Sequence, residues 1–281
     1  MKLLFIFPLA LFLILAIVLI LGIIFPRKTL PSLSEQDRYI QIQNTKLRYR
    51  IFNYGGGPDV ILLHSFGSNL NIWEPVAKRI KRGRIITLDL VGFGMSGSDA
   101  EIYSLDSHSR YVIAFMDTLK INSACLVGSS MGASIAVWTA SKNPERVSRL
   151  VLFAPSGFPG SMRHTWPLNL VYRPGFINKI MKIIVKTHLF RSLFPQSLGR
   201  QALEVTSSYD NFFVEALGEI KQPVDLVWSS GDKRVPFSYN AHFRKIISQA
   251  SLTKASVESG HDAAFHDPDF SARLIASAIA E

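Results

Sequence analysis

Short apolar runs alternate with longer amphipathic segments along most of this chain. The apolar runs, most of them rich in Val, Ile and Leu, are residues 60–63, 84–88, 124–127, 147–153, 224–228 and 252–257. Runs of this kind predict strands buried on both faces, as in a parallel sheet that helices cover. The amphipathic segments between them predict helices near 107–119, 132–141, 238–248 and 270–280. The alternation therefore predicts an α/β fold with a mostly parallel, doubly wound sheet.

The region just ahead of these runs has a different period. Apolar and polar residues alternate over 39–42 and again over 47–51, on either side of Asn44 and Thr45. A period of two around a short polar turn predicts a β-hairpin.

The first segment is strongly apolar. Residues 3–25 carry no charge, with Lys2 before them and Arg27 and Lys28 after them. A helix of this length crosses a hydrocarbon core of about 30 Å, whereas the apolar part of a cleavable signal peptide has only about 7–15 residues. We therefore expect a single-pass membrane anchor over 1–28 and a short polar tether over 29–38. Because basic residues flank the run on both sides, the charges leave its orientation open; we expect an extracytoplasmic catalytic domain.

The alternation stops between residues 156 and 222, which predicts a helical cap inserted between two parts of the core, 29–155 and 223–281. Residues 146–203 contain nine Lys and Arg but no Asp or Glu. A helix near 177–190 would be basic and apolar. It either rests on a lipid surface as a lid or packs on the core as an ordinary cap helix.

The net charge of +10 changes this picture little. The basic residues are scattered or stand beside apolar ones, and no nucleic-acid signature occurs, so an anionic membrane surface is the better partner. Cys125, the single cysteine, lies in an apolar run and is interpreted as a core residue. No Cys/His cluster and no nucleotide motif occurs, so we expect no metal and no cofactor.

The clearest chemical motif is Gly-Ser-Ser-Met-Gly at 128–132, which fits G-x-S-x-G. It follows one predicted strand and precedes a predicted helix, the context in which a serine occupies a sharp, strained turn that needs small neighbours. Ser130 is therefore the candidate nucleophile.

A serine hydroxyl needs a base, and the base needs a carboxylate that orients it. Asp232 follows the strand at 224–228 and His261 follows the last strand, so both reach the carboxyl edge of the sheet together with Ser130. The alternatives fit less well. His266 and Asp267 come one turn later, Asp262 adjoins His261, and Asp225 opens its strand at the opposite edge.

Acyl transfer also needs two donors for the oxyanion. We expect the amide N–H of Met131, at the start of the helix after the nucleophile, and that of Phe66, in the loop after the strand at 60–63.

Five motifs in order, 63–67, 89–96, 128–132, 232–236 and 260–261, resemble the α/β-hydrolase family, from about residue 39 to the end of the chain. The chain is similar to its serine hydrolase branch, which includes small esterases and monoacylglycerol lipases. One departure concerns His64-Ser65, where the family usually has His-Gly. A side chain there puts the position of the Phe66 N–H in doubt.

The resemblance implies a membrane-anchored serine hydrolase that cleaves a lipophilic carboxylic ester through an acyl-serine intermediate. Two alternatives stay open. One is C–C bond hydrolysis or perhydrolase chemistry with the same three residues, and the other is a catalytically silent, membrane-tethered binding or scaffold domain.

Overall fold

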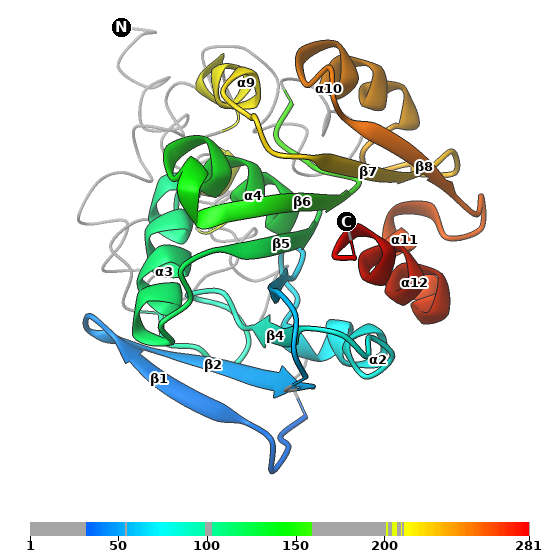
Figure 1. The fold of residues 1–281 in the computed structure, drawn as a ribbon. Helices are drawn as coiled ribbons and strands as arrows, with labels where there is room; N and C mark the ends of the chain where they lie inside the picture. The colour runs from blue at the N-terminus through cyan, green and yellow to red at the C-terminus, as the bar shows by residue number, and fades with distance from the viewer. Residues whose placement is uncertain are drawn as a thin grey trace, which may run out of the picture.

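The computed structural model describes residues 32–53, 55–98, 103–158, 201, 204–206, 209 and 211–280. Its centre is an eight-stranded sheet with the order β1-β2-β4-β3-β5-β6-β7-β8 (Figure 1). The strands are β1 (Arg38–Ile42), β2 (Thr45–Phe52), β3 (Asp59–Leu63), β4 (Arg84–Leu88), β5 (Ala124–Ser129), β6 (Val147–Phe153), β7 (Val224–Ser229) and β8 (Ser251–Ala255).

The sheet is mixed but mostly parallel. β1 and β2 form the predicted hairpin, and β2 runs antiparallel to β4. Every other pair, from β4 across to β8, is parallel. β3 lies between β4 and β5, so the chain leaves β3 to one side and then returns to pair on the other. Such a reversal of strand order leaves a crevice at the carboxyl edge of the sheet, where open α/β sheets bind their ligands.

Helices cover both faces of the sheet (Figure 1). One face carries α3 (Leu105–Thr118), α4 (Met131–Lys142), α9 (Asn211–Gly218) and α10 (Asn240–Ile246). The other carries α2 (Glu74–Ala77), α11 (Ala263–His266) and α12 (Pro268–Ala278). Short 3-10 turns are η1 (Leu70–Trp73), η2 (Pro144–Arg146), η3 (Phe237–Tyr239) and η4 (Gly260–Asp262).

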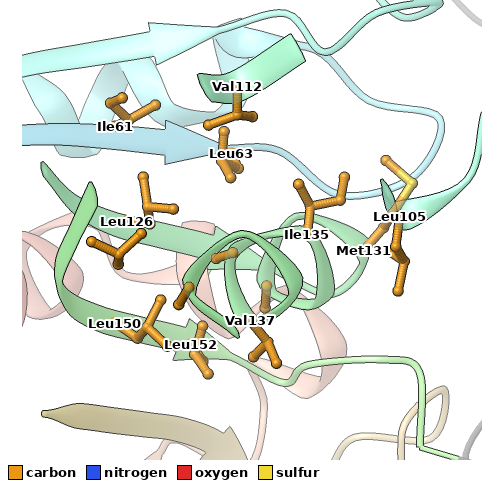
Figure 2. Packing of buried hydrophobic residues seen from close by; sticks show 14 of the residues in the cluster. Ile61, Leu63, Leu105, Val112, Leu126, Met131, Ile135, Val137, Leu150 and Leu152 are labelled. Atoms are coloured by element: carbon orange, nitrogen blue, oxygen red, sulfur yellow. The ribbon is translucent and has the colours of Figure 1, made fainter. Parts of the chain in front are cut away.

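The alternation of side chains along β3 divides the core into two layers. Ile61 and Leu63 point to the α3 and α4 side, where they join Val112 and Ile135 (Figure 2). Val60 and Leu62 point to the α2 and α12 side, and the buried Cys125 packs there as expected. Val60 to Leu63 are all fully buried between the two layers, which explains why the sequence of this strand lacks polar residues after Asp59.

The sequence predicted most of these elements, with two differences at the level of turns. β8 ends at Ala255 rather than 257, and Val257 lies in the following loop with 62% of its surface exposed. The helical stretch over residues 70–77 was not predicted, because two consecutive four-residue elements are too short to show a helical period.

Two predicted membrane-associated segments lie outside the described residues: the anchor over 1–28 and the basic helix near 177–190. In the part of the chain that the structure does describe, no helix has both the length and the apolar character needed to cross a bilayer. The described end of the predicted cap packs on the core, since Val205, Phe213 and Leu217 belong to the same apolar cluster as α4.

Residues 32–37 correct the prediction of a polar tether, because they are bonded to the sheet. Arg48 and Arg50 on β2 are fully buried and both donate to the carbonyl oxygen of Ser32, at 2.8 and 3.1 Å. Both also pair with the carboxylate of Asp37, at 2.9 and 2.6 Å. Burial acts to raise the pKa of Asp37, but the hydrogen bonds from the two arginines outweigh it and hold the pKa below its ordinary value. We call residues 32–37 with Arg48 and Arg50 the arginine clamp.

Candidate functional site

Ser130 sits at the turn between β5 and α4 with a backbone that few residues adopt. Its φ and ψ are 53° and −113°, a region that costs a non-glycine residue about 1–3 kcal/mol. Its hydroxyl caps no helix amide, and its amide N–H donates to the carbonyl of Phe153 at 2.9 Å. The surrounding structure therefore holds the strained turn and leaves the hydroxyl available.

The two glycines of the motif make this turn possible. A Cβ on Gly128 would lie 2.4 Å from the amide nitrogen of Ala133, in the first turn of α4. A Cβ on Gly132 would lie 2.3 Å from the carbonyl oxygen of Leu63 and 2.7 Å from that of His64. Only glycine allows α4 to begin this close to the end of β3, which brings Ser130 next to the loop after β3.

Asp232 and His261, which come from separate loops at the carboxyl edge, are brought into direct contact. The Nδ1 atom of His261 lies 2.8 Å from Oδ2 of Asp232. The other carboxylate oxygen accepts the amide N–H groups of Arg234 and Val235, at 2.8 and 2.9 Å. An imidazole that donates from Nδ1 to a fixed carboxylate keeps Nε2 as its acceptor, which is the state that a general base requires.

The three predicted residues thus lie on loops at one sheet edge, and two of them are in contact. The Ser130 hydroxyl makes no hydrogen bond to His261 within the described residues. Such contacts are often long when no substrate is bound. Ser130 is 6% exposed and Asp232 is 5% exposed, so both side chains are buried.

The alternative acids are engaged elsewhere. Asp225 pairs with Arg149 at 2.8 Å, at the amino edge of the sheet. Asp267 accepts the amide N–H of Phe270 at 2.9 Å and so caps α12.

The amides of Phe66 and Met131 remain candidates for the oxyanion. Neither donates a hydrogen bond in the loops, turns and caps of the described chain. Phe66 packs edge-on against Phe93, with ring centroids 5.5 Å apart, which fixes its loop. Ser65 is absent from the described residues with positive φ, whereas Gly67 has a φ of 70°. The serine therefore stands where any residue fits, which removes the conformational objection to the Phe66 donor.

Two buried histidines lie behind this loop. The ring of His64 uses both nitrogens on backbone, with Nδ1 2.8 Å from the carbonyl oxygen of Ser65 and Nε2 3.1 Å from the amide of Leu90. Burial lowers the pKa of His64, and the two backbone contacts give this ring a structural role. His108 on α3 is also buried, neither ring nitrogen has a partner among the described residues, and burial lowers its pKa to about 3.

Sequence reasoning missed a chain of hydroxyls behind the nucleophile. The Ser134 hydroxyl lies 3.2 Å from the carbonyl oxygen of Ser130 and 3.0 Å from the hydroxyl of Ser156, which in turn lies 2.7 Å from that of Tyr209. Burial raises the pKa of Tyr209 to about 12, so its hydroxyl stays protonated. Ser134 could have been found from its position one helical turn after Ser130, but nothing local to Tyr209 signals its partner.

Residues 58–193 match the family model described as "alpha/beta hydrolase fold". The chain belongs to the α/β-hydrolase fold family. The hairpin, the strand order and the turn at Ser130 are the framework on which this α/β-hydrolase chain carries its site.

The chain is similar in sequence to proteins that are named for different substrates. A 2-hydroxymuconate semialdehyde hydrolase of Pseudomonas sp. (strain CF600) is 33% identical over 116 residues, which are 40% of this chain and 41% of the relative. The monoacylglycerol lipase ABHD6 of Homo sapiens is 24% identical over 89% of this chain and 83% of its own length. This chain covers only 36%, 49% and 41% of the length of three curated relatives.

A solved structure shows the same fold over nearly the full length. A membrane phospholipase A, described as a bacterial virulence factor, superposes with a TM-score of 0.64 at 23% identity. The superposition covers 99% of this chain and 97% of that one. These three proteins are named for different substrates, so the comparisons do not resolve the substrate class of this chain.

Proposed function

We propose that this α/β-hydrolase is a membrane-anchored serine hydrolase that cleaves a lipophilic carboxylic ester. The observation that carries the proposal is the 2.8 Å contact between His261 Nδ1 and Asp232 at the sheet edge where Ser130 occupies its strained turn. A fixed carboxylate, an oriented imidazole and a serine held in a strained turn are the parts that acyl transfer needs.

The reaction would proceed in two halves. The Ser130 Oγ attacks the ester carbonyl while its proton passes to Nε2 of His261, and the amides of Phe66 and Met131 hold the oxyanion. When the C–O bond breaks, the alcohol leaves with the proton from His261 and an acyl-Ser130 remains. Water then attacks the acyl group as His261 takes one of its protons, and His261 returns that proton to Ser130 Oγ as the acid leaves, which restores the free serine. No cofactor takes part in this scheme.

The lipophilic substrate and the anchor rest on further support. Residues 3–25 are uncharged and long enough to span a bilayer. Two of the similar proteins are named as a monoacylglycerol lipase and a membrane phospholipase A. We infer a single-pass protein whose catalytic domain lies at the membrane surface, on the extracytoplasmic side.

The first test is labelling of the purified full chain with a fluorophosphonate, which reacts with activated serines. The wild type should be labelled, and Ser130→Ala and His261→Ala should each abolish the signal. An unlabelled but folded wild type would refute the serine hydrolase and favour a silent binding domain. A panel of esters with increasing acyl length then defines the substrate.

A second candidate function is C–C bond hydrolysis with the same residues. The 33% identity to a 2-hydroxymuconate semialdehyde hydrolase favours it. Labelled protein that cleaves a vinylogous diketone but no ester would select this alternative.

A further inference from the structure

A groove with a volume of about 520 Å³ opens beside the candidate oxyanion loop. One wall comes from the chain after β3, including Phe66, Ser68 and Asn71. The other comes from the loops that carry the acid and the base, including Arg234 and Asp262. The groove therefore lies between the loop after β3, which carries the predicted oxyanion donor Phe66, and the loops that follow β7 and β8. The acyl-transfer scheme above gives this groove no role.

The groove wall next to Asp232 carries the side chain of Arg234. The Arg234 side chain is exposed, and it forms no ion pair or hydrogen bond within the described residues. Its backbone is fixed, because its amide N–H donates to Asp232 at 2.8 Å. Asp262 is the one carboxylate among the residues that line the groove, and it too is exposed. A guanidinium on a fixed backbone suits a phosphate, whose oxygens accept its paired N–H donors.

The opposite wall lies beside the point where the chain enters from the predicted anchor. Asn71 lines the groove and also donates from Nδ2 to the hydroxyl of Ser32 at 3.0 Å. Arg48 and Arg50 of the arginine clamp donate to the carbonyl oxygen of the same Ser32. Ser32 is four residues after Lys28, the end of the predicted anchor, and four residues span at most about 14 Å. An anchor in a bilayer would thus keep Ser32, and the groove wall that is bonded to it, within about 14 Å of the end of the anchor.

We propose that this groove binds the anionic phosphate head group of a membrane lipid ester, with the Arg234 guanidinium as the phosphate contact. The inference rests on the proposed ester hydrolase and specifies the alcohol side of its substrate. In this assignment the groove takes the alcohol side of the scissile bond, so the released product would carry the phosphate.

The test compares two substrates with the same acyl chain, a monoacyl glycerophosphate and the uncharged monoacylglycerol, in mixed micelles with the full chain. The quantity measured is the ratio of kcat/KM for the phosphorylated ester to that for the neutral ester. Arg234→Gln should lower this ratio about tenfold, because it removes a charge-assisted hydrogen bond whose strength is reduced by the exposure of the side chain to solvent. Arg234→Lys should restore part of it. Arg244→Gln on α10 removes an equally exposed charge far from the groove and should leave the ratio at the wild-type value.

The outcomes separate the two proposals. A chain that no fluorophosphonate labels refutes the hydrolase and the groove together. A labelled chain that cleaves the neutral ester but not the phosphorylated one refutes only the groove, as does an unchanged ratio in Arg234→Gln. Inhibition by inorganic phosphate that equals the effect of the lipid head group would show that the groove selects free phosphate rather than a lipid, and would also overturn the proposal.

Discussion

Replacing Asp232 by Asn tests the arrangement of the candidate site with a minimal change in shape. The asparagine oxygen can still accept the amides of Arg234 and Val235, which the aspartate holds at 2.8 and 2.9 Å. Its NH₂ group, however, would face Nδ1 of His261, where the carboxylate now lies at 2.8 Å. A donor at that position forces the imidazole proton onto Nε2, the atom that must receive the serine proton.

The expected loss is therefore large in rate and small in stability. In serine triads the same exchange lowers kcat about 10⁴-fold, which at about 1.36 kcal/mol per factor of ten is about 5.4 kcal/mol of transition-state stabilisation. Here we expect a fall in kcat of roughly 10³–10⁴-fold. Because both backbone hydrogen bonds survive, the free energy of unfolding should change by less than about 2 kcal/mol.

Two measurements check this on the purified full chain: kcat for a chromogenic short-chain ester and the rate of fluorophosphonate labelling. Urea denaturation supplies the unfolding free energy. Asp269→Asn is the control, since this carboxylate is 63% exposed and pairs with Arg79 on the surface. A folded Asp232→Asn protein whose kcat lies within tenfold of the wild type would show that Asp232 is not the acid.

Two further changes probe the packing behind the site. Gly132→Ala should destabilise the chain by about 3 kcal/mol and lower Tm, because the new Cβ would fall 2.3 Å from the backbone oxygen of Leu63. The control is Gly56→Ala, whose Cβ would have nothing within 4 Å and should leave Tm unchanged. Equal Tm values for the two variants would contradict the close contact at Gly132. His108→Leu removes two unpartnered ring nitrogens and should be neutral or stabilising at pH 7. The pKa of His108 is lowered to about 3, so the unfolded chain takes up a proton below about pH 6.5 that the folded chain refuses, and stability falls as the pH drops through this window. Urea denaturation at pH 7 and pH 5 should show the wild type losing about 2 kcal/mol more than His108→Leu; parallel losses would mean that His108 is protonated in the fold.

The sheet was predictable because its strands are buried on both faces. Val60 to Leu63 must be apolar throughout, since alternate side chains enter different core layers, and the same holds for residues 124–127 of β5 and 150–153 of β6. The hairpin of β1 and β2 was predictable from its period of two, although buried Arg48 and Arg50 interrupt the expected core. Those arginines are satisfied by Asp37 and Ser32, which no local pattern connects to β2.

The site was predictable where local geometry demands particular residues. Gly128 and Gly132 flank Ser130 because no other residue fits there, and this constraint is visible in the sequence itself. The hydroxyl chain through Ser156 and Tyr209 and the groove beside Arg234 depend on contacts between distant segments. Their residues are ordinary serines, a tyrosine and an arginine, which signal nothing until the fold brings them together.

The arginine clamp determines where a soluble version of the catalytic domain can begin. A truncation at Arg38, the first residue of β1, would keep every strand but remove Asp37 and the Ser32 carbonyl. The two buried guanidinium groups would then lose the acceptors that they share, and would keep only Asp89 and Asn71 for Arg48 and Glu74 for Arg50. Breaking a buried ion pair in this way typically costs about 3–5 kcal/mol. The boundary of the folding unit therefore lies at or before Ser32, six residues ahead of the first strand.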